Sequence, residues 1–98
     1  MFTLMIINKI HWLGVGLSSP PGILYLNDQR YDLIVWNRSV DKAETLLKNK
    51  INVNKLDISN FSKKLDKNDL IVSMLPASMH MEIAELAIKY KCHLVTSS

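Results

Sequence analysis

The feature of this sequence that most constrains its fold is a series of short apolar runs, each followed by a segment with helical periodicity. The runs over residues 33–35 and 70–72 contain no polar side chain. A strand that is apolar on both faces is buried on both faces, which is typical of a parallel sheet covered by helices. We therefore expect strands over residues 10–13, 32–36, 53–58, 70–75 and 93–96, separated by helical segments over 20–29, 39–48, 61–65 and 78–90.

Strands that alternate with helices pair in parallel through right-handed crossovers. The expected fold class is therefore α/β, a Rossmann-type doubly wound parallel sheet of five strands in the order 3-2-1-4-5. In such a sheet a ligand binds at the carboxyl ends of the strands, where the first and fourth strands part. Residues 14–19, 37–39 and 76–80 should line that crevice. We treat residues 1–98 as one domain, with residues 1–9 as an N-terminal extension or a lead-in strand.

Composition narrows the classes of function. The net charge is +3, and the one local cluster of lysines is Lys63, Lys64 and Lys67. A nucleic-acid surface needs a longer basic stripe with aromatic side chains to stack on, so we expect a solvated helix end and no nucleic-acid partner. Cys92 is the only cysteine, which excludes an internal disulfide and favours a cytoplasmic location. No apolar run is long enough to cross a bilayer, and we expect neither a membrane contact nor a metal site.

The segment over residues 14–19 lies between an expected strand and an expected helix, the context that a dinucleotide-binding turn requires. Gly14 would allow the tight turn, and Gly16 would let the backbone approach a pyrophosphate. Leu17 and Ser18 complete the loop, and Ser19 replaces the third glycine of the usual pattern. The N–H groups and dipole of the following helix would favour a negative charge. The sequence Pro-Pro-Gly over 20–22 leaves the start of that helix open, and a plain strand-to-helix turn is the alternative.

The residues Asn37, Arg38 and Ser39 follow the second expected strand, 23 positions after Gly14. An NAD site normally places Asp or Glu here to bind the ribose hydroxyls, and that carboxylate would repel a 2′-phosphate. Asn37 removes the charge, Arg38 can fork onto a phosphate or stack on adenine, and Ser39 can donate a hydroxyl and an N–H group. We therefore expect NADP in preference to NAD, with an ordinary surface arginine as the alternative.

Two further segments complete the expected crevice. Asp57 and Ile58 end the third expected strand, at the level that flanks adenine, where Asp57 would accept a hydrogen bond from the adenine amino group or cap the following turn. Leu75, Pro76 and His80 follow the fourth strand, beside the nicotinamide half. His80 should lie in the first turn of a helix, whose dipole disfavours the protonated ring. Contact with cofactor or substrate and a structural role both stay open for His80.

Residues 11–16, 35–38 and 72–80, together with the closing residues 94–98, resemble the N-terminal domain of the saccharopine dehydrogenase family. The resemblance covers the chain from about Ile10, and its fourth-strand segment and closing residues are more specific to this family than the glycine turn. It implies that Gly14, Gly16 and Ser19 bind the pyrophosphate and that Arg38 and Ser39 bind the adenosine phosphate. It also implies that residues 73–76 and 96–98 border the nicotinamide.

Members of this family join such a domain to a larger substrate domain and act on amino-acid secondary amines with NAD or NADP. The resemblance implies an NADP(H)-binding domain of a saccharopine-dehydrogenase-like oxidoreductase, truncated before its substrate domain, so the chain alone should be inactive. A stand-alone nucleotide-sensing module, a shikimate-dehydrogenase-like cofactor domain and a remnant that binds nothing are the alternatives. The apolar strand over 93–96 favours a homodimer, through the sheet edge or through the face that a substrate domain would cover.

Overall fold

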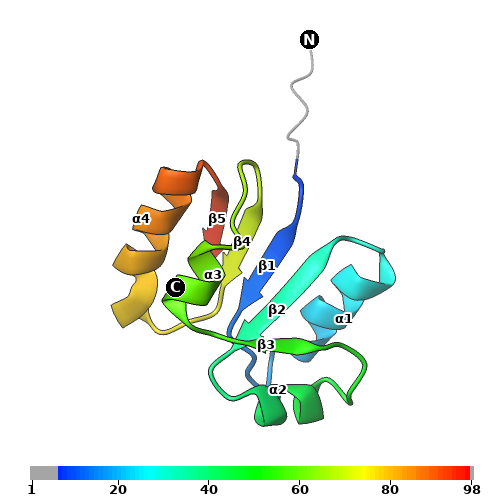
Figure 1. Cartoon of the computed structure of the whole chain (residues 1–98). Helices are drawn as coiled ribbons and strands as arrows, with labels where there is room; N and C mark the ends of the chain where they lie inside the picture. The colour runs from blue at the N-terminus through cyan, green and yellow to red at the C-terminus, as the bar shows by residue number, and fades with distance from the viewer. Residues whose placement is uncertain (1–6, 98) are drawn as a thin grey trace.

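The computed structural model describes residues 7–97, which form a five-stranded parallel sheet with helices on both faces (Figure 1). The expectation for residues 1–9 lies mostly outside the described residues. The strand order is β3-β2-β1-β4-β5, which confirms the expected doubly wound topology. The strands are β1 (Ile10–Leu13), β2 (Leu33–Asn37), β3 (Val53–Lys55), β4 (Leu70–Ser73) and β5 (His93–Thr96). The helices are α1 (Pro20–Asp28), α2 (Val40–Leu46), α3 (Ile58–Ser62) and α4 (His80–Tyr90), with a 3-10 turn η1 (Ala77–Met79) before α4.

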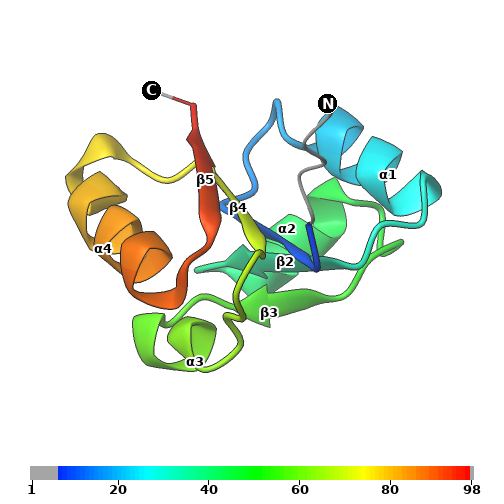
Figure 2. The same ribbon diagram turned by 90° about the horizontal axis from the view of Figure 1, so that it is seen from above.

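The two faces of the sheet carry separate hydrophobic cores. Helices α1 and α2 cover one face and α3 and α4 cover the other, as the view from above shows (Figure 2). Successive side chains of a strand point to opposite faces, so in β1 Trp12 belongs to the first core and Leu13 to the second. The first core also contains Ile23 of α1, and the second contains Phe61 of α3. Within residues 7–97, none of the helices is both long and apolar enough to cross a membrane.

Several boundaries differ from the expected ones. The expectation that the third strand runs to Ile58 is wrong, because β3 ends at Lys55 and Ile58 is the first residue of α3. The carboxylate of Asp57 accepts a hydrogen bond from the Ser59 N–H at 3.0 Å, which caps α3 and turns the chain out of the sheet. Likewise β4 ends at Ser73 instead of Leu75, and the chain then leads through η1 into α4.

A buried polar network links β1 to β2 and to the segment before β4. His11 and Asp69 are both fully buried, and the His11 Nε2 lies 2.8 Å from a carboxylate oxygen of Asp69. The indole N–H of Trp36 donates to the other ring nitrogen of His11, at 3.2 Å. Since a tryptophan can only donate, His11 Nδ1 must accept, and the proton of the neutral ring therefore sits on Nε2 and is donated to Asp69. Lys9 forms an ion pair with the same carboxylate at 3.3 Å.

This environment shifts the pKa values of both buried groups. Burial lowers the pKa of His11, and the hydrogen bond to Asp69 offsets only part of that effect. Burial raises the pKa of Asp69, but hydrogen bonds from the Asp66 backbone, the His11 ring and Lys9 outweigh it, so the carboxyl pKa lies below its ordinary value. Both shifts hold the network in the form of a neutral imidazole beside a carboxylate.

The free energy of unfolding should therefore fall on acidification, in two stages. Below about pH 6.5 the unfolded chain protonates His11 while the folded protein does not, which favours unfolding as the pH falls toward the lowered pKa. A second loss should begin below the ordinary Asp pKa of 3.8 and continue through the lowered pKa of Asp69. Urea unfolding between pH 5 and 8 measures the first stage. His11→Gln should flatten that slope and His93→Gln should keep it; an unchanged slope in His11→Gln would contradict the assignment.

Candidate dinucleotide-binding site

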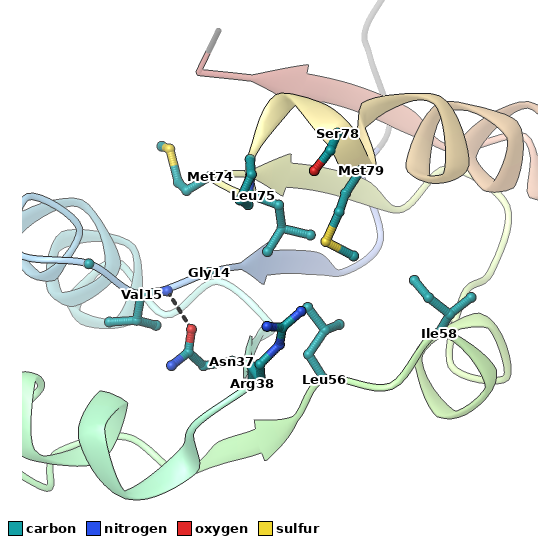
Figure 3. A pocket seen from close by; sticks show the side chains of 12 residues that line it. Gly14, Val15, Asn37, Arg38, Leu56, Ile58, Met74, Leu75, Ser78 and Met79 are labelled. Atoms are coloured by element: carbon teal, nitrogen blue, oxygen red, sulfur yellow. Dashed lines mark hydrogen bonds between the residues drawn. The ribbon is translucent and has the colours of Figure 1, made fainter.

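A cavity of about 590 Å³ opens at the carboxyl ends of the strands, in the crevice between β1 and β4 (Figure 3). It contains seven of the residues expected there, from the glycine loop, the end of β2, the start of α3 and the segment after β4. Its lining residues are Gly14, Val15, Gly16, Asn37, Arg38, Leu56, Ile58, Met74, Leu75, Pro76, Ser78 and Met79. A second hollow of similar volume adjoins it between the glycine loop and α2 and contains Leu17. The remaining expected residues, Ser18, Ser19, Ser39, Asp57 and His80, line neither cavity.

The two glycines of the loop meet different constraints. Gly14 has a φ of +92°, and a Cβ there would lie 3.2 Å from the Leu75 side chain and 3.3 Å from the Met74 carbonyl carbon. Backbone conformation and space therefore both require glycine at position 14. At Gly16 a Cβ would have no heavy atom within 4 Å, because the residue faces the open cavity. Position 16 is thus free of protein atoms where a ligand could approach the backbone.

Two side chains accept hydrogen bonds from the inner N–H groups of this loop, those of Val15 and Gly16. Asn37 Oδ1 accepts a hydrogen bond from the Val15 N–H at 2.9 Å, the bond drawn in Figure 3. The hydroxyl oxygen of Ser19 accepts from the Gly16 N–H at 3.2 Å. Ser19 is only 5% exposed, so its hydroxyl shapes the loop from inside. The small side chain expected in place of a third glycine therefore packs under the turn.

The outer N–H groups of the loop are the ones left for an anion. The amide groups of Leu17 and Ser18 donate no hydrogen bond to any residue between 7 and 97, and Leu17 is 89% exposed. The helix that follows contributes less than its position suggests, because α1 begins with Pro20 and Pro21, which have no N–H. The donors of this strand-to-helix junction thus lie in the loop itself rather than in the first residues of the helix.

At the end of β2 the three expected residues take different places. Arg38 is exposed, and its side chain extends into the cavity beside Leu56 (Figure 3). Ser39 is the N-cap residue of α2 but makes no side-chain capping bond. The carboxamide of Asn37 bonds to Val15 and to the Ser39 carbonyl oxygen, at 2.9 and 2.8 Å. Arg38 is the one charged residue of this cavity's lining, so the cavity presents a cation and no carboxylate, while Asp41 and Lys42 line the adjoining hollow.

The opposite wall of the cavity is apolar. Leu56 and Ile58 come from the connection between β3 and α3, and Leu75 and Met79 come from the segment before α4. Asp57 lies between two of these residues, but its carboxylate is used to cap α3. His80 is the first residue of α4, as expected for a residue in the first helical turn, and it is half-buried.

Five lining residues were not singled out from the sequence as site residues, namely Val15, Leu56, Met74, Ser78 and Met79. Val15, Ser78 and Met79 nevertheless fall within the ranges expected to line the crevice, and Met74 falls within the segment expected to border the nicotinamide. Each is adjacent in sequence to an expected site residue or one position removed from it, so a wider window around each motif would have found them. Among the described residues there is no group of three or more His, Cys, Asp or Glu side chains placed to hold a metal ion.

A doubly wound parallel sheet with a glycine loop, open loop amides and a cation at the end of β2 defines a dinucleotide-binding domain. The family described as saccharopine dehydrogenase NADP binding domain matches residues 10–98, and the chain belongs to this family. Its cofactor is accordingly NADP.

Two relatives place this domain in a longer polypeptide. The chain is 26% identical to a saccharopine dehydrogenase [NADP(+), L-glutamate-forming] of Pyricularia oryzae over 99 aligned positions, which cover 96% of the chain and 22% of that protein. The structure of apo saccharopine dehydrogenase (L-Glu forming) from Saccharomyces cerevisiae matches with a TM-score of 0.74 and 29% identity, over 93% of this chain and 22% of that one. The chain thus spans about a fifth of the length of these relatives.

The contrast between the two glycines predicts opposite effects of alanine on stability. Gly14→Ala should lower the free energy of unfolding by about 1–3 kcal/mol, because alanine would be held at positive φ against Leu75 and Met74. Gly16→Ala is the matched control and should stay within about 0.5 kcal/mol of the wild type. Urea unfolding of the three proteins measures both values, and equal losses in the two variants would contradict this description of the loop.

Proposed function

We propose that this domain holds NADP(H) across the crevice as the cofactor-binding part of a saccharopine-dehydrogenase-like oxidoreductase. The observation that carries the proposal is the pairing of Arg38, in a cavity without carboxylates, with a loop whose outer amides have no protein acceptor. The residues of the cavity fit NADP(H), because position 16 is open to a ligand and lines the cavity of about 590 Å³. Bound NADP(H) would supply the hydride chemistry, while the chain binds and orients it.

The pyrophosphate would lie over the glycine loop. Gly14 forms the turn, and Gly16 allows close approach of the ligand to the backbone. The N–H groups of Leu17 and Ser18 would donate to the phosphate oxygens, helped by the positive end of the α1 dipole. Ser19 would support these contacts from beneath the loop through its bond to Gly16.

The adenosine phosphate would lie at the end of β2. Arg38 would form charged hydrogen bonds to the 2′-phosphate, and Ser39 would add its hydroxyl and backbone N–H at the start of α2. The absence of a carboxylate among the cavity residues removes the repulsion that a 2′-phosphate would meet in an NAD site. Leu56 and Ile58 would pack against the adenine ring, and Asp57 would act on it only through the cap that holds Ile58 in place.

The nicotinamide would lie toward the segment after β4. Leu75 and Pro76 line the cavity there, and His80 begins the helix behind them. Hydride transfer also needs a substrate held against the nicotinamide and a group to move a proton. We propose that those groups come from outside these 98 residues, because the relatives are about five times as long, and we therefore expect that the chain alone does not turn over an amino-acid substrate.

Arg38→Ala should weaken NADPH binding by about 1.5–3 kcal/mol, the range for a hydrogen bond to a charged group, and change NADH binding little. Calorimetric titration with both cofactors measures this difference. Lys50→Ala removes one positive charge at the amino ends of the strands, outside the cavity, and serves as the control for net charge. Equal losses for NADPH and NADH in Arg38→Ala would remove the phosphate role of Arg38.

Gly16→Val should abolish the binding of both NADPH and NADH while the domain stays folded. The valine side chain would fill space that is empty of protein atoms and that the pyrophosphate needs. Circular dichroism checks the fold, and the same titrations check binding. Unchanged NADPH affinity in a folded Gly16→Val protein would place the pyrophosphate elsewhere.

We also propose a cytoplasmic location and self-association of the chain through β5. β5 is an edge strand that pairs with β4 alone, and Val95 on it is 55% exposed. An apolar edge without proline or lysine pairs readily with another strand. The location is supported by Cys92, which as the one cysteine of the sequence cannot form an internal disulfide.

Light scattering over a range of concentrations should detect a dimer of the wild-type chain. Val95→Lys should shift it to monomer, because a charge on the edge strand discourages pairing. Ile88→Lys changes an apolar residue on α4 that is even more exposed than Val95 and should leave the dimer intact. A wild-type monomer at all concentrations would refute the association.

A further inference from the structure

Asn37, the last residue of β2, joins three segments that line the crevice. Its side-chain oxygen accepts the Val15 N–H at 2.9 Å, and its side-chain nitrogen donates to the Ser39 carbonyl oxygen at 2.8 Å. Its backbone carbonyl accepts the Leu56 N–H at 2.9 Å. One residue thus connects the glycine loop, the start of α2 and the end of β3.

The chemistry of this position calls for an amide. Val15 presents a donor and Ser39 presents an acceptor, so the side chain between them must accept on one side and donate on the other. An aspartate has only acceptors when ionised, and one of its oxygens would face the Ser39 carbonyl oxygen without a proton between them. The absence of a carboxylate at the end of β2 therefore has a structural cause in addition to the electrostatic one.

The bond to Val15 also decides which amides of the loop remain for a ligand. With the Val15 N–H turned to Asn37 and the Gly16 N–H turned to Ser19, the next two amides have no acceptor among residues 7–97. The bond to the Ser39 carbonyl oxygen fixes the peptide that follows Ser39, one residue beyond Arg38, the cation of the crevice. The same carboxamide therefore sets the distance between the two parts of the crevice that carry positive potential.

We propose that Asn37 is a positioning residue that couples these two anion sites, so that one ligand can occupy both at once. The proposal rests on the proposed binding of NADP(H). It assigns Asn37 no direct contact with a phosphate: the residue acts through the Val15 bond on the glycine loop and through the Ser39 bond on the Arg38 turn.

Ligands that contact one or both of the two anion sites distinguish a positioning role of Asn37 from direct binding by Asn37. Adenosine 2′-monophosphate carries only the phosphate expected at Arg38, whereas adenosine 2′,5′-bisphosphate and NADPH also reach the glycine loop. Asn37→Ala should weaken the bisphosphate and NADPH by about tenfold, since two hydrogen bonds that hold the loops are lost. It should change the affinity for the 2′-monophosphate by less than about twofold. Asn52→Ala, an exposed asparagine before β3, is the matched control and should bind all three ligands like the wild type.

Amide hydrogen exchange of the wild-type chain tests the same bond without a variant. The Val15 amide should exchange slowly in the absence of ligand, while the Leu17 and Ser18 amides should exchange fast until the bisphosphate is added. Asn37→Ser, a milder change that keeps one hydroxyl, should be measured as well in case Asn37→Ala does not fold. Fast exchange of Val15 in the wild type would overturn the proposal whatever the variants do.

The remaining outcomes are distinct. Wild-type affinities retained by Asn37→Ala, or an equal loss for all three ligands, would overturn the coupling role while leaving NADP(H) binding in place. Failure of the wild-type chain to bind NADPH and the bisphosphate would overturn the proposed function itself, and with it the role of Asn37. A loss of affinity in Asn37→Ala that is confined to the bisphosphate and NADPH supports both the coupling role of Asn37 and the proposed function.

Discussion

The structure depends on the burial of β1, which is paired on both edges and covered by helices on both faces. β2 and β4 pair with it in parallel, and all four of its side chains are buried. A strand in this position cannot leave a polar group without a partner, because an unpaired polar group costs free energy away from water. His11 is the one polar residue of β1, and Trp36 and Asp69 satisfy both of its ring nitrogens. Through these two hydrogen bonds, His11 positions both the segment before β4, which carries Asp69, and β2, which carries Trp36.

The two ends of the sheet consequently have different characters. At the amino ends, Lys9, His11, Asp66 and Asp69 form a closed set of ion pairs and hydrogen bonds. Within residues 7–97, no buried side-chain nitrogen or oxygen lacks a partner. At the carboxyl ends the backbone amides of Leu17 and Ser18 donate to no acceptor within the described part of the chain. The polar groups at the amino ends bond to one another, which contributes stability. At the carboxyl ends a ligand can supply hydrogen-bond acceptors for the loop amides.

The sequence predicted the strand order and the crevice because both follow from local patterns. Apolar runs and helical periodicity determine the element order, and the right-handed crossover then leaves few topologies. It predicted the end of β3 poorly, because Val53–Lys55 is an edge strand with little apolar pattern and the Asp57 cap competes with continued pairing. The bond of Asn37 to Val15 could not be predicted, because it joins positions whose separation is set only once β1 and β2 pair. The bond of Ser19 to Gly16 joins positions only three apart, but it depends on the conformation that the loop takes.

The proline pair at the start of α1 shows how local sequence and ligand binding constrain each other. A helix normally offers several unpaired N–H groups in its first turn, and a phosphate can use all of them. Pro20 and Pro21 fit the first helical positions because their fixed φ suits the helix, but they remove two of those donors. The amides of Leu17 and Ser18 then remain without an acceptor among the described residues, and their direction depends on the bonds that hold Val15 and Gly16 from below. The geometry of the phosphate site proposed for this domain therefore depends on side chains that lie beneath the loop and belong to β2 and to the cap of α1.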